Sequence, residues 1–180
     1  MEYLAILCYL FLFWSKVGFS LASNCTISST QFSALQALFD SCNGPSWKWN
    51  SSSTKWIFPS GLDVPCTDNW QGLTCLSKPN NIGVCSIAKI ELSSMNLTGP
   101  LPLEIGNFPD LADLKLDKNQ ISSSLPTTVG LLVHLQTLDL RASNITGSLS
   151  NELFNLQNLQ LILFSDNQLT GCRIGFITDS

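Results

Sequence analysis

Two successive stretches of the chain carry the same apolar residues, 24 positions apart. The first is LADLKLDKNQISSSLPTTVGLLVH, from Leu111 to His134, and the second is LQTLDLRASNITGSLSNELFNLQN, from Leu135 to Asn158. Leucine or isoleucine occupies offsets 1, 4, 6 and 11 in both, whereas most other positions differ. Apolar residues two apart are typical of a strand, whose alternate side chains point to one face. Each stretch therefore predicts a short strand with one buried face, followed by a turn.

The same apolar frame extends by one unit in each direction. It falls upstream on Ile87, Ile90, Leu92 and Leu97, and downstream on Leu159, Ile162, Phe164 and Leu169. The units are 87–110, 111–134, 135–158 and an incomplete 159–171. A fixed period of about 20 to 29 residues with L-x-x-L-x-L-x-x-N-x-L is the leucine-rich repeat signature. One unit cannot bury its own leucines, but stacked units can. We therefore expect an α/β solenoid, a horseshoe of parallel strands with an irregular or 3-10 convex side.

Offset 9 of such a unit is usually asparagine, whose amide bonds backbone groups at the turn. The second and fourth units have this asparagine, as Asn119 and Asn167. The first and third units have Met95 and Ser143 in its place. We expect a less regular turn in these two units, and we expect Met95 to fill volume beside the N-terminal cap.

The N-terminal residues 1–22 resemble a secretory signal peptide. An apolar run from Leu4 to Trp14 precedes the small residues of SLAS, which places cleavage near Ala22. The run is short for a bilayer span, which needs about 20 residues. Because Glu2 is present and no Lys or Arg precedes the run, an uncleaved anchor stays open as an alternative.

Residues 23–86 predict a cap over the first repeat. The stretch SSTQFSALQALFDSCNGP predicts a helix, with Ser28 and Gln31 in capping-box spacing and a stop at Asn43. Several tryptophans and the stretch VPCTDNWQGLTC follow. A solenoid needs such a cover because its first unit otherwise exposes leucines and a strand edge.

Composition limits the function classes. The chain has 9 Lys and Arg against 13 Asp and Glu, so a nucleic-acid partner is disfavoured. Six of the 7 cysteines follow the leader: Cys25, Cys42, Cys66, Cys75, Cys85 and Cys172. In an exported chain they predict disulfides, with 15 connectivities open. Because no C-x-x-C pair occurs and His134 is the single histidine, no metal or other cofactor is expected.

The stretch PCTDNWQGLTC (Pro65 to Cys75), followed by LSSMNLTGPLPLEIGNFPD (Leu92 to Asp110), resembles extracellular plant-type leucine-rich repeat proteins. That family includes ectodomains of receptor-like kinases and receptor-like proteins, and polygalacturonase inhibitors. The resemblance implies a disulfide between Cys66 and Cys75, and the pairing of Cys25, Cys42, Cys85 and Cys172 stays open. It also implies a secreted or cell-surface module that binds a protein or peptide. The first hypothesis is a receptor-like ectodomain or its soluble form, and the alternative is an inhibitor of a secreted cell-wall hydrolase.

The fourth unit departs from the pattern at its end. Offset 15 holds leucine in the first three units, whereas the fourth has Arg173. We therefore expect residues 172–180 to be an irregular tail and the chain to be a truncated form of a longer array. A membrane span would then lie on the missing part or in an uncleaved leader. Because the last leucines would lack cover, we expect self-association at this open end.

We expect the binding surface on the concave face, because the side chains at offsets 3, 5 and 7 point away from the core. The candidates are Lys89, Glu91, Asp113, Lys115, Asp117, Asp139, Arg141, Leu161 and Leu163. Parallel neighbours stand about 4.8 Å apart, so Glu91, Lys115 and Asp139 should stack with alternating sign. Such a stack is either a self-neutralised surface ladder or part of a partner-binding patch.

Four N-x-S/T sequons, at Asn24, Asn50, Asn96 and Asn144, predict glycosylation. The sequence contains no motif that indicates a catalytic site. A role for His134 would need a nucleophile and an orienting acid, and no sequence frame supplies them. We expect the protein not to be an enzyme.

Overall fold

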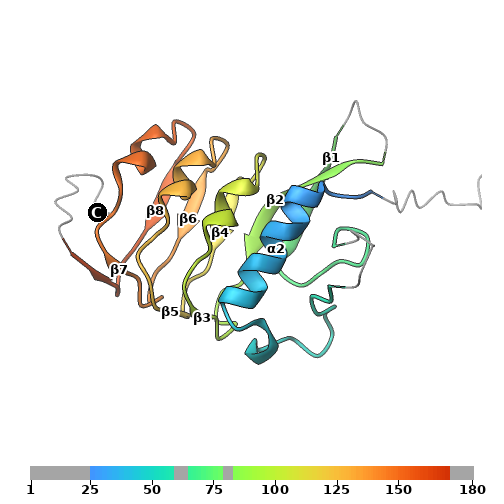
Figure 1. Ribbon diagram of the computed structural model, residues 1–180, viewed down its shortest axis with the longest axis horizontal. Coiled ribbons are helices and arrows are strands. Elements are labelled where there is room, and N and C mark those ends of the chain that lie inside the picture. Colours follow the sequence, from blue (N-terminus) through green and yellow to red (C-terminus); the bar gives the residue numbers. More distant parts are fainter. Residues whose placement is uncertain (1–24, 59–64, 79–82, 171–180) are drawn as a thin grey trace, which may run out of the picture.

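The structure, a computed structural model, describes residues 25–58, 65–78 and 83–170. The predicted leader, Asn24, Cys172 and the tail 172–180 lie outside these residues. Successive units stack along one axis, and helix α2 (Ser29–Ser41) lies with the cap at one end (Figure 1). The prediction of an α/β solenoid with a helical N-terminal cap is confirmed.

The main sheet has five strands in the order β1-β2-β4-β6-β8. They are β1 (Leu73–Ser77), β2 (Cys85–Glu91), β4 (Asp113–Lys115), β6 (Thr137–Asp139) and β8 (Leu161–Leu163). The last four are parallel, and their register advances by 24 residues a strand, as the sequence repeat requires. Strand β1 pairs antiparallel with β2, so a cap strand closes the edge that the first repeat would otherwise expose.

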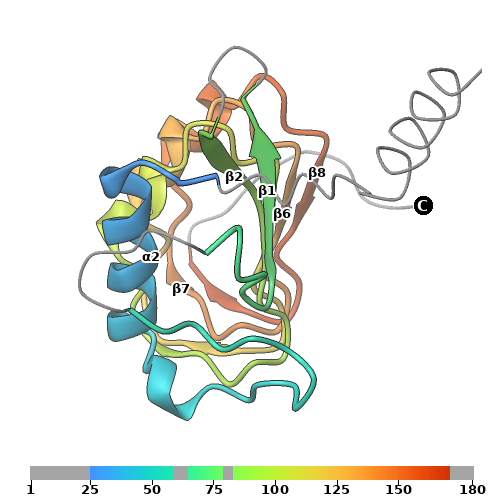
Figure 2. The same ribbon diagram turned by 90° about the vertical axis from the view of Figure 1, so that its right-hand side faces the viewer.

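Short 3-10 helices form the opposite side of the stack: η2 (Leu103–Asn107), η3 (Thr127–Leu131) and η4 (Asn151–Asn155). Viewed along the stack, the strands lie on one side and these helices lie with α2 on the other (Figure 2). A Cβ atom at Gly106 would stand 2.5 Å from the carbonyl oxygen of Thr128, and one at Gly130 would stand 2.7 Å from that of Glu152. Glycine therefore permits the close approach of neighbouring 3-10 helices.

The leucines of the repeat frame form the core. Leu111, Leu114, Leu116 and Ile121 are fully buried, as are their equivalents in the first and third units. Burying each such side chain contributes roughly 1.5 to 3 kcal/mol. In the fourth unit Ile162, at offset 4, is 38% exposed, because no described segment covers the end of the stack at β8.

The turns after the main strands alternate between two conformations. Ser94 and Asn96 have positive φ in the first unit, as Ala142 and Asn144 do in the third. The second and fourth units have one such residue each, Lys118 and Asp166. The expectation of a less regular turn beside Met95 and Ser143 is confirmed.

Short strand pairs follow the same alternation. Strand β3 (Thr98–Gly99) pairs with β5 (Gln120–Ile121), and β7 (Thr146–Gly147) pairs with β9 (Gln168–Leu169). Met95 is buried in the core, and its sulfur accepts a hydrogen bond from Gln71 of the cap.

Helix α2 begins as the sequence predicts, but only half of the capping box forms. The Ser28 hydroxyl oxygen accepts a hydrogen bond from the Gln31 N–H at 3.3 Å. The side chain of Gln31 does not return to Ser28. Its Oε1 instead accepts from the N–H of Ile87 at 2.9 Å and from the hydroxyl of Ser86. Because Gln31 is buried against β2, that strand is a better partner than the helix start.

The cap encloses a cluster of aromatic rings between α2 and the first repeat. Its members are Phe32, Phe39, Trp47, Trp49, Trp56, Phe58 and Trp70. The buried indole N–H groups are satisfied, because Trp47 donates to the carbonyl of Cys42 and Trp56 to that of Gln71. The cap thus supplies an apolar layer that covers the N-terminal end of the solenoid.

Candidate functional site

The candidate site is the solvent-facing side of β2, β4, β6 and β8. In β4 the central Leu114 is buried, while Asp113 and Lys115 on either side are half-buried and face outward. The equivalent residues of the neighbouring strands stand beside them in register, such as Lys89 beside Asp113 and Glu91 beside Lys115. The four strands therefore place the predicted concave-face residues in adjacent rows.

Two ion pairs join β2 to β4 across the sheet. The Lys89 Nζ lies 2.5 Å from a carboxylate oxygen of Asp113, and the Lys115 Nζ lies 2.7 Å from one of Glu91. Both pairs are partly exposed, so each contributes at most about 1 kcal/mol to stability. Charges on this part of the face largely neutralise one another.

The alternating row of Glu91, Lys115 and Asp139 forms, but Asp139 has a different ion-pair partner. Its carboxylate pairs with Arg141 of the same unit, with distances of 2.6 Å to Nη2 and 2.9 Å to Nε. This bidentate arrangement matches the guanidinium geometry better than a Lys115 ammonium could. Lys115 bonds to Glu91 instead, so the predicted alternating stack is present in register, and its ion pairing ends at Lys115.

Two predicted surface acids are covered by their neighbours. Asp139 and Asp117 are only 5% and 7% exposed. Asp117 accepts a hydrogen bond from the hydroxyl of Ser93 in the preceding unit. Their carboxylates therefore orient neighbouring side chains, and the outermost charged groups are the cations of Lys89 and Arg141 and the carboxylate of Glu91.

The environment shifts the pKa of several of these groups. Burial acts to raise the pKa of Asp113, but hydrogen bonds from Lys89 and Thr137 outweigh it and the pKa is lowered. Burial likewise opposes the Arg141 hydrogen bonds at Asp139, whose pKa is also lowered. The hydrogen bond to Glu91 raises the pKa of Lys115. All three groups are therefore charged at neutral pH.

The face becomes apolar at β8. Leu161 stands beside Thr137 in register, and Leu163 beside Asp139. Leu161 is 42% exposed and Leu163 is half-buried. Around the end of the stack, Leu149, Leu153, Phe154, Leu156, Leu159 and Ile162 line an apolar hollow of about 230 Å³. The candidate surface thus runs from paired charges to exposed leucines.

Two disulfides cross-link the cap. Cys66 bonds to Cys75, the pair that the resemblance implied, and Cys25 bonds to Cys85. The sequence leaves the partner of Cys25 open, and the structure pairs it with a cysteine 60 residues away. The chain entry at Thr26 bridges Val84 and brings the two cysteines together. Cys42 is free and fully buried, and this burial raises the pKa of its thiol to about 12.

The described sequons lie on loops and turns. Asn50 is exposed, whereas Asn96 and Asn144 are half-buried in the left-handed turns at offset 10. The amide nitrogen of Asn96 donates to the carbonyl of Ser46. Glycosylation at these three residues, and at Asn24, stays a prediction.

His134 is exposed at the end of the second unit. Within residues 25–58, 65–78 and 83–170, the cluster with metal-ligand spacing is Cys25, Cys66 and Cys85, and all three sulfurs are held in disulfides. In the same residues no helix is long and apolar enough to cross a membrane.

The chain is similar to known leucine-rich repeat proteins. The Leucine Rich Repeat family model matches residues 134–156. Leucine-rich repeat extensin-like protein 6 from Arabidopsis thaliana is 36% identical over 81 residues, which are 45% of this chain. The chain spans only 15% of that relative's length.

Solved structures show the same architecture. The ectodomain of the receptor kinase SOBIR1 from Arabidopsis thaliana has a TM-score of 0.65 at 24% identity, over 81% of this chain and 71% of that chain. A chain of the BIR3–SERK2 complex from the same organism has a TM-score of 0.64 at 28% identity, over 77% and 70%. The PEPR1–AtPEP1 structure gives 0.57 at 28% identity, over 79% of this chain and 18% of that chain.

Proposed function

We propose that this chain, a plant-type leucine-rich repeat protein, is a recognition module that binds a protein or peptide through the solvent-facing side of its main sheet. The observation that carries the proposal is the change along that face from paired charges on β2, β4 and β6 to exposed leucines on β8. A rigid sheet that presents polar and apolar groups side by side suits an extended ligand. The similarity to a chain of the BIR3–SERK2 complex supports assembly with another protein.

The exposure of the paired groups defines the ligand's chemistry. The side chains of Lys89 and Arg141 are 43% and 47% exposed, whereas their partners Asp113 and Asp139 are 15% and 7% exposed. In these two pairs the outer groups are N–H donors whose charge is partly neutralised from below, and the Glu91 carboxylate, 42% exposed, is an acceptor on the same face. The donors suit carboxylate or carbonyl oxygens of a ligand, and Leu161, which lies in the same row as Lys89 but three strands away, suits an apolar side chain. We infer a ligand segment with acidic and apolar residues in succession.

Salt dependence follows from the pairing. Because the charges of this face cancel at a distance, they steer a ligand only weakly. Short-range contacts then supply most of the affinity, and moderate salt should weaken binding only slightly.

The binding test uses peptides selected by display against the full chain. Leu161→Asp places a charge on the proposed site, and Leu131→Asp makes the same change on the convex side, where Leu131 is 62% exposed. The first variant should weaken binding of the selected peptides at least tenfold, or about 1.4 kcal/mol, and the second should leave it unchanged. Equal effects of the two variants, or peptides indifferent to Leu161, would place recognition elsewhere.

We further propose that this module is extracellular and belongs to a receptor-like protein or its soluble form. The two cap disulfides support an oxidising compartment. The alternative, an inhibitor of a secreted cell-wall hydrolase, would use the same face. Nanomolar inhibition of a polygalacturonase that is lost in Leu161→Asp would favour the inhibitor, and its absence across a hydrolase panel would favour the receptor-like role.

A further inference from the structure

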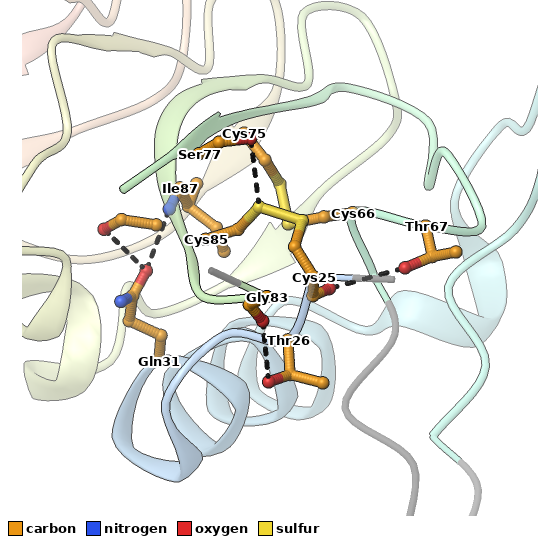
Figure 3. The surroundings of a disulfide bond; sticks show 11 residues. Cys25, Thr26, Gln31, Cys66, Thr67, Cys75, Ser77, Gly83, Cys85 and Ile87 are labelled. Carbon is orange, nitrogen blue, oxygen red and sulfur yellow. Dashed lines mark hydrogen bonds between the residues drawn. A yellow bond between two sulfur atoms is a disulfide. The ribbon is translucent and has the colours of Figure 1, made fainter. Parts of the chain in front are cut away.

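The two disulfides of the cap lie against each other, and we propose that they exchange partners through Cys66. The sulfur atoms of Cys25, Cys66 and Cys85 all lie within 4.8 Å of one another. Cys25 is bonded to Cys85, whereas Cys66 is bonded to Cys75 (Figure 3). One sulfur of the second disulfide therefore stands next to both sulfurs of the first.

The two disulfides differ in their access to solvent. Cys66 and Cys75 are half-buried, whereas Cys25 and Cys85 are 6% and 2% exposed. All four line a surface pocket of about 460 Å³. This volume admits a small thiol, and the low exposure of Cys25 and Cys85 favours its attack on the outer disulfide. The inner disulfide is therefore reached through Cys66.

The exchange consists of two thiolate attacks. An external thiolate attacks the sulfur of Cys75, forms a mixed disulfide there and releases Cys66 as a thiolate. Cys66 then attacks the sulfur of Cys25, forms a Cys25–Cys66 disulfide and releases Cys85 as a thiolate, which takes a proton from water. One S–S bond forms and one breaks in each step, so the external thiol is the only co-reactant.

Ser77 decides which sulfur leaves in the second step. Its hydroxyl oxygen lies 3.9 Å from the sulfur of Cys85. A disulfide sulfur carries no hydrogen, so the hydroxyl is the donor in this contact. Donation to the sulfur stabilises negative charge as it develops on Cys85, and a better-stabilised thiolate leaves faster. The product is therefore Cys25–Cys66 with Cys85 free.

The exchange would change what holds the N-terminal segment. The segment is now tied to the start of β2 by the disulfide and by two backbone hydrogen bonds, from Thr26 to Gly83 and from Cys85 to Thr26. After exchange the covalent tie runs from Cys25 to the loop at Cys66, and β2 keeps only its hydrogen bonds. The cap thus carries a thiol-responsive connection at the end of the solenoid.

Two variants of the full chain test the proposal without added reductant. Cys75→Ser leaves Cys66 as a thiol beside Cys25–Cys85, and Cys66→Ser leaves Cys75, which lies outside the three-sulfur cluster. Both lose the same disulfide, so each is the stability control for the other. After incubation at pH 8, native alkylation and peptide mapping should find label on both Cys66 and Cys85 in Cys75→Ser. Among the cysteines of the cap, it should find label in Cys66→Ser on Cys75 alone.

Label confined to Cys66 in Cys75→Ser, or the same spread of label in both variants, would overturn the proposal. Adding Ser77→Ala to Cys75→Ser should slow the labelling of Cys85 by about two- to tenfold, the value of one hydrogen bond. If a variant does not fold, the wild-type chain is treated briefly with glutathione. The expected product carries Cys25–Cys66 and glutathione on Cys75, and opening of Cys66–Cys75 with Cys25–Cys85 intact contradicts the exchange.

Discussion

The hydroxyl of Ser143 donates a hydrogen bond to the carbonyl oxygen of Leu116 at 2.7 Å, reaching back into the preceding unit. Asn119 and Asn167 reach back in the same way, to Leu92 and Leu140. The Oδ1 of Asn167 also accepts from the N–H groups of Ser143 and Ile145. Each asparagine therefore supports its own turn and the preceding one, so an asparagine in every second unit maintains the hydrogen-bond ladder.

This division of work predicts unequal effects of two substitutions. Asn119→Ala leaves the buried N–H of Leu97 and the carbonyl of Leu92 without the amide, and should lower the free energy of unfolding by about 2 to 4 kcal/mol. Ser143→Ala removes one bond to Leu116, which keeps its bond from Asn119, and should cost about 1 kcal/mol. Urea unfolding of the two variants measures the difference. Equal losses would contradict the ladder.

The convex side predicts that glycine is required at offset 20 of the first two units, where the next 3-10 helix packs against it. Gly106→Ala and Gly130→Ala place a methyl group against the next 3-10 helix, within 2.5 and 2.7 Å of a backbone oxygen. Each should lower the free energy of unfolding by about 1 to 3 kcal/mol, because the neighbouring backbone must move. Leu103→Ala, at a 65% exposed position of η2, is the control and should change stability little. Thermal unfolding that shows no loss for the glycine variants would refute the close packing.

The lowered pKa of Asp113 predicts a loss of stability in acid. Its ordinary pKa is 3.8 and its folded pKa is lower, so its stabilising contribution is complete above pH 3.8 and is lost as pH falls through the folded value. Lys89→Met removes the ammonium group that bonds to Asp113, while the burial of Asp113 stays. The pKa of Asp113 in the folded protein therefore rises. Stability should then fall at neutral pH, and the further loss on acidification should become smaller.

Urea unfolding between pH 2 and 7 compares this variant with Lys55→Met, which removes an exposed lysine of the cap. An unchanged pH profile in Lys89→Met would show that the Asp113 pair does not contribute.

We expect the thiol of Cys42 to be unreactive in the folded protein. Burial raises its pKa to about 12, so almost no thiolate is present at pH 8, and its sulfur is enclosed beside the carbonyl of Pro100. Iodoacetamide should leave the Cys42 peptide unlabelled under native conditions and label it fully in guanidinium chloride. Native labelling at the rate of a free cysteine would mean that this part of the cap opens readily.

The solenoid and its buried face follow from the sequence alone. Leu111, Leu114 and Leu116 recur with a period of 24 residues, and stacking successive units buries them. The strands, their register and the outward-facing offsets therefore follow from the pattern. The same pattern predicts that Lys89, Asp113 and Leu161 lie on one face of the sheet.

Which of these groups interact depends on the tertiary packing. Asp139 pairs with Arg141 rather than Lys115, and Gln31 bonds to Ile87 rather than to its own helix start. Cys25 meets Cys85 across 60 residues of chain. The physical reason is common to all three. Apolar burial depends on which face a residue occupies, and sequence period determines that face, whereas hydrogen bonds, ion pairs and disulfides need particular atoms within a few ångströms. Only the packed cap and the stacked units bring those atoms together.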